Sequence, residues 1–169
     1  MSQLQQRYLE LFDYADGKLY WREDRGSQKC KGKVAGTLNN DGYSKVRVRE
    51  LGNSVGVHRV IYCMQHGYMP DFIDHINGVR DDNRIENLRP VTQQQNSYNG
   101  KIRTHNTSGS KNVSWNKKLE KWGVSITVDY KRKFLGLFED LELAQLVAME
   151  ARNKYHGVYA NHGVTKCQF

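Results

Sequence analysis

Cysteine is scarce in this chain of 169 residues, and its placement excludes two classes of small protein. The three cysteines, Cys30, Cys63 and Cys167, are scattered, odd in number and never spaced as a Cys-x-x-Cys pair. A zinc ribbon needs paired cysteines and a disulfide framework needs an even set, so we predict neither. A chain without a disulfide framework is typical of a reducing compartment, and we expect a cytoplasmic protein.

Long hydrophobic runs are also missing. The N-terminal sequence MSQLQQRYLELF is polar and lacks the apolar core of a signal peptide. No apolar stretch approaches the length of a transmembrane helix, so we expect no membrane partner.

Acidic residues are fewer than basic ones, 18 against 26, which gives a net charge of +8 and a pI of about 9.4. Residues 100–169 carry most of the excess, with 12 basic and 6 acidic residues, whereas residues 1–99 hold 14 and 12. This balance favours a polyanionic partner, although a solvated basic surface is the common alternative.

The segment FIDHINGVRDDNRIENLRPVTQQQN, residues 72–96, contains the residue types that phosphodiester cleavage requires. His75 can deprotonate a water molecule. Asp74 and Asn96 can supply the hard oxygen ligands that Mg²⁺ prefers, and a metal neutralises the charge that develops on phosphate. Taken singly, each of these residues is more simply explained as a loop or surface residue, but together they predict a nuclease site.

The same segment predicts the order strand, loop, strand, helix. Phe72-Ile73 is a short extended stretch, Asn77-Gly78 is a turn, and residues 85–91 form a second strand. Thr92 is the expected N-cap of the helix. In this order Asp74-His75 ends the first strand and Asn96 lies near the first helical turn, from which the helix can bring it back against Asp74.

The run DHINGVRDDNRIENLR, residues 74–89, resembles the HNH family of nucleases, whose core is a ββα-metal motif; the resemblance covers residues 58–99. It implies that His75 is the general base, that Asp74 and Asn96 bind Mg²⁺ or Mn²⁺, and that Asn87 holds the His75 loop. Many members have a histidine at the position of Asn96, and an amide there disfavours a tight zinc site. Similar members are phage and intron-encoded homing endonucleases, some of them nicking enzymes, so the expected location becomes the cytoplasm of a bacterial host.

His58 lies in VHRVIYCMQHG, which has apolar residues at helical spacing. A similar His-Arg pair recurs in the family on the helix that backs the site. We therefore interpret His58 as mainly structural.

The region before this motif predicts a helix over residues 2–12 and two strands, residues 34–38 and 43–48, around a turn at residues 39–42. Lys45, Arg47 and Arg49 alternate along the second strand and would share one face. That face is either a basic stripe for DNA phosphates or an ordinary exposed sheet face, and the sequence favours neither.

The polar run 100–110 is the expected linker, in which Lys101 and Arg103 are available to DNA phosphates. Beyond it, residues 113–116, 123–128 and 132–138 predict three strands. A helix follows, with Asp140 as N-cap and Gly157 as C-cap. Its expected apolar face consists of Leu143, Ala144, Val147, Ala148 and Ala151.

This last region resembles the AP2 DNA-binding domain through SGSKNVSWNKKLEKWGVSI, KFLGLFEDLELAQLVAMEARNKYHG and the closing YANHG. The resemblance implies a three-stranded antiparallel sheet that enters the major groove, supported by one helix. Core packing is the alternative interpretation of the two tryptophans. The expected DNA contacts are Trp115, Lys117, Lys118, Lys121, Trp122, Ser125, Thr127, Tyr130 and Arg132.

The sequence thus predicts an α+β protein with an HNH nuclease domain and its β-rich N-terminal extension at residues 1–99, a linker at 100–110 and an AP2-like domain at 111–169. The expected activity is metal-dependent, sequence-directed cleavage of double-stranded DNA, by nicking or by a double-strand break, leaving 5′-phosphate and 3′-hydroxyl ends. We expect a monomer, because two linked modules can span an asymmetric site. The alternatives are a non-catalytic DNA-binding regulator built on a nuclease fold and a structure-specific or RNA-directed nuclease.

Overall fold

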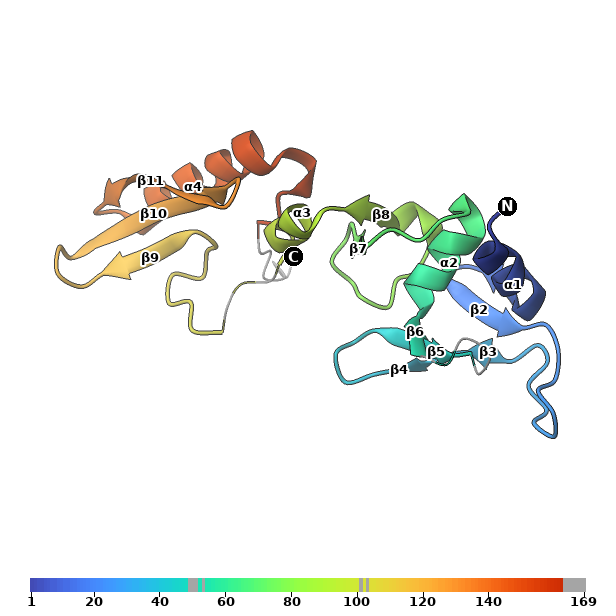
Figure 1. The fold of residues 1–169 in the computed structure, drawn as a ribbon. Coiled ribbons are helices and arrows are strands. Elements are labelled where there is room, and N and C mark those ends of the chain that lie inside the picture. The colour runs from blue at the N-terminus through green and yellow to red at the C-terminus, as the bar shows by residue number, and fades with distance from the viewer. Residues whose placement is uncertain (49–51, 53, 101, 103, 163–169) are drawn as a thin grey trace. The chain divides into compact units, whose positions relative to one another are not determined.

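The computed structural model describes residues 1–48, 52, 54–100, 102 and 104–162 of a mixed α and β protein. The chain divides into two compact units, Met1–Val91 and Thr92–Phe169 (Figure 1). Each unit has its own hydrophobic core. None of the helices in the described part of the chain has the length and apolar character that crossing a bilayer requires.

The first unit begins with a capped helix and two small sheets. The Ser2 hydroxyl accepts a hydrogen bond from the Gln5 amide at 3.2 Å, which starts the expected N-terminal helix. The expected strand 34–38 is divided at Gly36, whose φ is +111° and where a Cβ would lie 2.9 Å from Val57 Cγ2. The elements are α1 (Gln3–Leu11), an antiparallel sheet of β1 (Phe12–Ala15), β2 (Lys18–Trp21) and β3 (Val34–Ala35), and a second one of β4 (Thr37–Leu38), β5 (Ser44–Arg47) and β6 (Ser54–Gly56).

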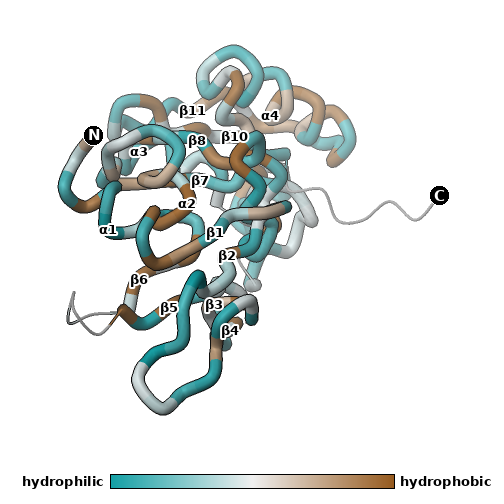
Figure 2. The backbone as a smooth tube through the Cα atoms, turned by 90° about the vertical axis from the view of Figure 1, so that its right-hand side faces the viewer, coloured by the Kyte–Doolittle hydropathy of each residue, from teal (hydrophilic) through white to brown (hydrophobic). Residues whose placement is uncertain are grey.

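Helix α2 (Val57–His66) fills the centre of the first core. It ends at Gly67, whose left-handed backbone (φ 82°) lets its amide donate to the Cys63 carbonyl at 2.9 Å. Figure 2 shows α1, α2, β1 and β2 grouped in this unit. The most deeply buried residues of the core are Tyr8, Phe12, Leu19, Val46, Val48, Val60, Ile61 and Cys63.

A two-stranded antiparallel sheet of β7 (Phe72–His75) and β8 (Leu88–Val91) completes the first unit. The second strand is shorter than the expected 85–91, because η2 (Ile85–Asn87) is a single turn of 3₁₀ helix. The Ile85 amide donates to the Tyr14 hydroxyl at 3.1 Å and so cannot join the ladder.

Helix α3 (Gln93–Tyr98) has the expected N-cap: Thr92 and Gln95 exchange hydrogen bonds in a capping box. Its described contacts are within the second unit. The Tyr98 ring stacks on His156 with centroids 3.6 Å apart, and the Lys111 ammonium donates to the Tyr98 carbonyl at 2.8 Å. The compact units therefore divide before α3, whereas the sequence placed the boundary at residue 99.

The second unit contains a three-stranded antiparallel sheet in the order β11-β10-β9. Val113 of β9 and Val124 of β10 pack against Ala144 and Ala148 of the long helix. The elements are β9 (Val113–Asn116), β10 (Lys121–Val128), β11 (Lys131–Phe138), α4 (Leu141–His156) and η3 (Gly157–Tyr159).

Helix α4 starts and ends where the sequence predicts. The Asp140 carboxylate accepts from the Leu143 amide at 2.7 Å, and the helix ends before Gly157. One member of the expected apolar face is wrong: the Leu143 side chain is 50% exposed. Two other members of that face, Ala144 and Ala148, are buried against the sheet as expected, and their small side chains let the helix approach it closely.

Candidate functional site

Asp74 and His75 are polar residues at the end of β7, yet both are buried. The strand pairing places Arg89 of β8 opposite Asp74. Arg89 donates to the Asp74 carboxylate through Nη2 at 2.8 Å and through Nε at 3.1 Å. A buried carboxylate needs such a partner, and the pair fixes the orientation of the Asp74 side chain.

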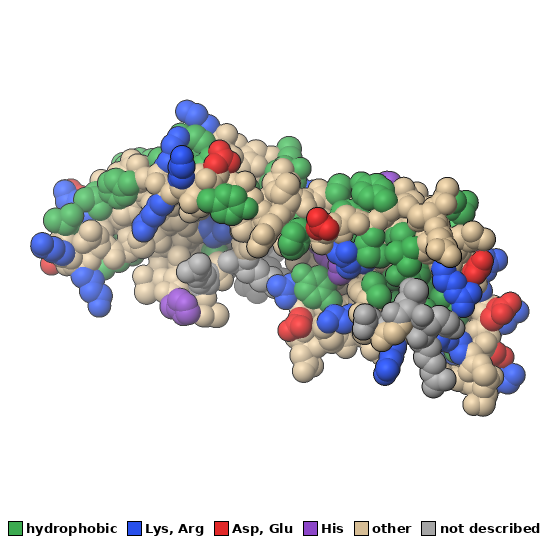
Figure 3. Space-filling view, in the orientation of Figure 1, with side chains coloured by type: hydrophobic (Ala, Val, Ile, Leu, Met, Phe, Trp, Pro, Cys, Tyr) green, Lys and Arg blue, Asp and Glu red, His purple; other side chains and the backbone are tan. Residues whose placement is uncertain are grey.

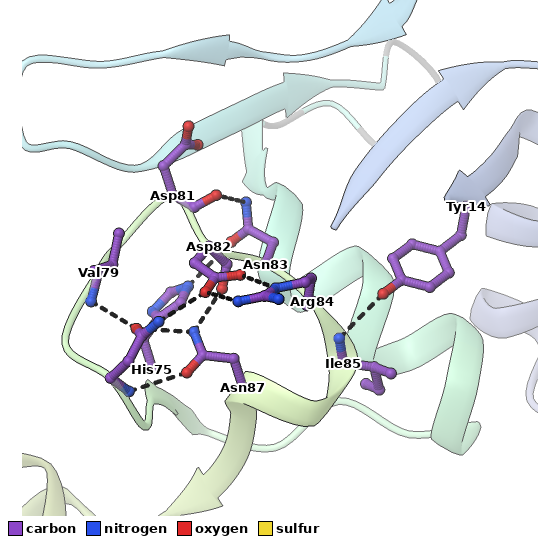
Figure 4. Close-up of polar contacts among 10 residues, drawn as sticks. Tyr14, His75, Val79, Asp81, Asp82, Asn83, Arg84, Ile85 and Asn87 are labelled. Atoms are coloured by element: carbon purple, nitrogen blue, oxygen red, sulfur yellow. Dashed lines mark hydrogen bonds and ion pairs between the residues drawn. The ribbon is translucent and has the colours of Figure 1, made fainter. Parts of the chain in front are cut away.

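The His75 ring is oriented by Asn83, a residue that the sequence analysis did not single out. The His75 Nε2 atom lies 3.0 Å from the Asn83 Oδ1 atom, and both side chains are buried (Figure 4). The Asn83 Nδ2 atom donates to the Asp81 carbonyl at 3.3 Å, which is consistent with Oδ1 facing the ring. An amide oxygen only accepts, so Nε2 carries the proton, and neutral His75 has its basic lone pair on Nδ1.

Asn87 ties together the loop that follows His75. Its Oδ1 accepts from the Asn77 amide at 3.0 Å, and its Nδ2 donates to the Asp82 carbonyl at 2.7 Å. Arg84 hydrogen-bonds to the Asp82 carboxylate at 2.7 and 2.8 Å, and this contact holds the pKa of Asp82 well below its usual range. Side-chain hydrogen bonds thus join the two ends of the loop at residues 76–84 (Figure 4).

Two aromatic rings from distant segments pack around His75. His58 of α2 meets it edge-on, with ring centroids 5.2 Å apart, and Tyr43 lies 5.9 Å from His75 and 5.5 Å from His58. Burial lowers the pKa of His58 to about 4, and the neighbouring His75 and Arg59 add to this effect. His58, interpreted as structural from its helical pattern, therefore touches the candidate base, and it does so as a neutral ring near neutral pH.

Asn96 lies on α3, where it is exposed and its amide donates to the Thr92 carbonyl at 2.9 Å. The structure brings together Asp74, His75 and Asn87 in the first unit, whereas Asn96 belongs to the second. Among the described residues no three histidine, cysteine or acidic side chains form a cluster that could hold a metal ion. A metal here would need carboxylate, amide and water oxygens, a set that suits Mg²⁺ because Mg²⁺ retains several of its waters.

Two of the predicted DNA contacts in the first unit lie on β5. Lys45 and Arg47 are exposed on either side of the buried Val46, so the two basic side chains share one face. Lys and Arg side chains are spread over the surface seen in Figure 3. Three further predicted contacts, Arg49, Lys101 and Arg103, lie outside the described residues.

In the second unit the two tryptophans lie on the helix side of the sheet. Trp122 pairs with Trp115 across β10 and β9, their ring centroids are 4.8 Å apart, and Trp122 packs against the core. Directly paired residues project to the same face. The Trp115 side chain is 41% exposed, so it lies at the edge of that core.

The opposite face of this sheet carries Ser125, Thr127 and Arg132. The Arg132 Nε atom donates to the Ser125 hydroxyl at 2.9 Å, which holds the guanidinium over the face. Phe134 pairs with Ser125 and is 64% exposed, a large apolar side chain that the sequence analysis missed. The remaining predicted contacts lie at strand ends and turns: Lys117 and Lys118 are exposed, Lys121 pairs with Glu139 at 3.0 Å, and Tyr130 is exposed in the β10–β11 turn.

Comparison with known proteins places the candidate site inside a recognised segment. Residues 55–98 match the HNH endonuclease family. Protein 3.8 of Escherichia phage T7 is 35% identical over 107 residues, which cover 61% of this chain and 86% of that protein. No solved structure matches the chain. The family match includes α2, β7, β8 and α3, and therefore His58, Asp74, His75, Asn87 and Asn96.

Proposed function

The chain belongs to the same family as Protein 3.8 of Escherichia phage T7 and carries an HNH endonuclease domain at residues 55–98, and on this premise we propose that it is a metal-dependent, sequence-directed DNA endonuclease of the homing type. The observation that carries the proposal is the buried contact between His75 Nε2 and Asn83 Oδ1. It supports a neutral His75 whose basic nitrogen is Nδ1, the atom that we propose accepts the proton in hydrolysis.

In the proposed reaction His75 accepts a proton from water as the water oxygen bonds to phosphorus. The bond from phosphorus to the 3′ oxygen breaks, the 3′ oxygen takes up a proton from solvent, and the products are a 5′-phosphate and a 3′-hydroxyl end. Asp74 and Asn96 would hold Mg²⁺ or Mn²⁺, which neutralises charge on the phosphate and the leaving oxygen. Arg89 keeps the Asp74 carboxylate in one orientation, and Asn87 keeps the loop after His75 closed.

The second unit is proposed to be an AP2-like module that selects the DNA site. The sheet face that carries Ser125, Thr127 and Arg132 lies away from α4 and is supported from behind by it. A two-faced antiparallel sheet with polar and basic residues on its open face can read base edges in the major groove. The protein is proposed to act on double-stranded DNA as a monomer.

The test is cleavage of supercoiled plasmid carrying host or phage DNA, with Mg²⁺, with Mn²⁺ and with EDTA. We expect the wild type to nick or linearise the plasmid only with metal, and His75→Ala to lose cleavage while it still binds DNA. His66→Ala is the matched control, because His66 is an exposed histidine of the same unit and should cleave normally.

Two results would contradict the proposal. If the wild type binds DNA tightly but cleaves none of these plasmids with either metal, the protein is a DNA-binding regulator on a nuclease fold. If His75→Ala cleaves as fast as His66→Ala, a group other than His75 accepts the proton.

A further inference from the structure

Tyr43 is a contact point between the candidate base and a cation. Its ring lies 5.9 Å from the His75 ring, and the Arg80 guanidinium carbon lies 4.9 Å from the centroid of the same ring. Arg80 belongs to the loop at residues 76–84 that follows β7, whereas Tyr43 immediately precedes β5. An arginine over a tyrosine face is held by attraction between its charge and the ring.

A second contact, inside the turn between β4 and β5, also restrains the Arg80 side chain. The Arg80 Nη1 atom donates to the Asp41 carbonyl at 2.7 Å. Its stem passes over Gly42, where a Cβ would lie 3.8 Å from Arg80 Cδ. The Ser44 hydroxyl also donates to the Asp81 carboxylate, so the loop and the turn are joined at two places. Arg80 is therefore restrained although it is exposed.

The charge of Arg80 differs from that of the other two arginines in this motif. Arg84 is paired with the Asp82 carboxylate and Arg89 with the Asp74 carboxylate. Among the described residues, the contacts of Arg80 are a carbonyl and an aromatic ring, neither of which carries a formal negative charge. Among the described residues Arg80 therefore has no ion pair, and its charge can still pair with an anionic group.

We propose that Arg80 binds a phosphate of the substrate DNA beside His75, with Tyr43 and the Asp41 carbonyl holding it in place. The inference rests on the proposed nuclease function and adds a substrate-binding residue to it. A guanidinium has five donors in a planar fork that fits two phosphate oxygens, and the Asp41 contact uses one of them. The restraint matters because a side chain already held in place loses little rotamer entropy when DNA binds.

The test measures two quantities on the same proteins. The first is the salt dependence of binding to a short fluorescein-labelled duplex from the plasmid, in EDTA. The second is the rate of plasmid cleavage with Mg²⁺. Arg80→Ala should lower the slope of log K against log salt by about 0.9, the value for one lost phosphate contact. It should also slow cleavage roughly 10- to 100-fold, as expected for the loss of a charged hydrogen bond at the site.

Four further variants separate charge, geometry and fold. Arg80→Lys should keep the salt slope but cleave more slowly, because lysine keeps the charge and loses the planar fork. Tyr43→Phe should match the wild type, since the ring and not the hydroxyl contacts Arg80, whereas Tyr43→Ala should cleave more slowly. Arg7→Ala is the control: it removes one partly exposed arginine, paired with Glu10 on α1, and should change neither quantity.

The outcomes separate this inference from the nuclease proposal. A wild type that cleaves and an Arg80→Ala variant with the same slope and rate would overturn the role of Arg80 alone. A wild type that neither binds nor cleaves DNA overturns the nuclease proposal and this inference with it. Thermal melting of each variant shows whether a lost activity reflects a lost fold.

Discussion

The Oδ1 atom of Asn83 lies 3.0 Å from the Nε2 atom of His75, and the two side chains are 3% and 4% exposed. A short polar chain thus runs from the Asp81 carbonyl through the Asn83 amide to the imidazole. Because each link has a fixed donor and acceptor, the chain selects one neutral tautomer of His75 and one orientation of its ring. In this tautomer the basic nitrogen of the ring is Nδ1.

Asn83→Ala should slow cleavage roughly 10- to 100-fold, because the tautomer and the ring orientation of His75 are no longer fixed. DNA binding should stay near normal. Asn83→Asp provides the contrast, because a carboxylate at this place stabilises the imidazolium form of His75. As the pH is lowered, this variant should therefore lose cleavage at a higher pH than the wild type does. Rates across a pH series check both, and an Asn83→Ala variant as fast as the wild type contradicts the positioning role.

The ion pairs Arg89–Asp74 and Arg84–Asp82 should contribute differently to the free energy of unfolding. Arg89→Met removes an ion-pair partner of a carboxylate that is 8% exposed, and the loss of this buried pair should cost about 3–5 kcal/mol of unfolding free energy. Arg84→Met breaks a similar contact with Asp82, but the Arg84 side chain is 56% exposed. The unfolding midpoint of this variant should therefore differ little from that of the wild type. Urea denaturation of both variants makes the comparison, and equal losses would refute it.

Local signals predicted the elements that carry the site. The Thr92 cap, the Asp140 cap and the alternation in β10 depend on neighbours a few residues away, and the structure has them where the sequence indicated. The order of β7, β8 and α3 follows from the same short-range patterns.

Contacts between distant segments could not be predicted in this way. The packing of Tyr43 and His58 on His75 joins a turn, a helix and a strand whose sequences carry no sign of one another. Asn83 had a signal only in hindsight, as an amide in a loop rich in acidic and basic residues. The anchoring of α3 through the Tyr98 ring also depends on His156, far along the chain.

Gly56 leaves space for the His58 ring. Its backbone is extended (φ −63°, ψ 134°), a conformation that alanine also adopts, but a Cβ there would lie 2.6 Å from His58 Cε1. Gly56→Ala should therefore displace the ring and cost about 1–3 kcal/mol of stability. In a double-mutant cycle with His58→Ala this cost should largely vanish, because the obstructing ring is gone. Additive losses would show that Gly56 acts through its backbone alone.

His58 should make the protein less stable in acid. Its pKa is about 4 in the folded protein and near 6.5 when unfolded, so between these values the unfolded chain binds a proton that the folded chain does not. Stability should therefore fall as pH drops from about 6.5 to 4 and should gain nothing from this group above 6.5. His58→Ala should show a shallower fall over this window in melting temperature. Parallel curves for the two proteins would assign the acid sensitivity to other groups.

The stack of Tyr98 on His156, with ring centroids 3.6 Å apart and planes at 7°, should decide how well α3 is held in the second unit. Tyr98→Ala should remove about 0.5–1.5 kcal/mol beyond the lost apolar contact, and the α3 amides, including that of Asn96, should exchange faster with deuterium. Tyr98→Phe keeps the stack and loses only the hydroxyl contact to Gln94, so its exchange should stay close to the wild type.

If Asn96 is a metal ligand, Tyr98→Ala should also need more Mg²⁺ for half-maximal cleavage, because a ligand on a loosened helix must be ordered when the metal binds. Faster exchange with an unchanged Mg²⁺ requirement would separate the stability of α3 from the metal site and count against Asn96 as a ligand.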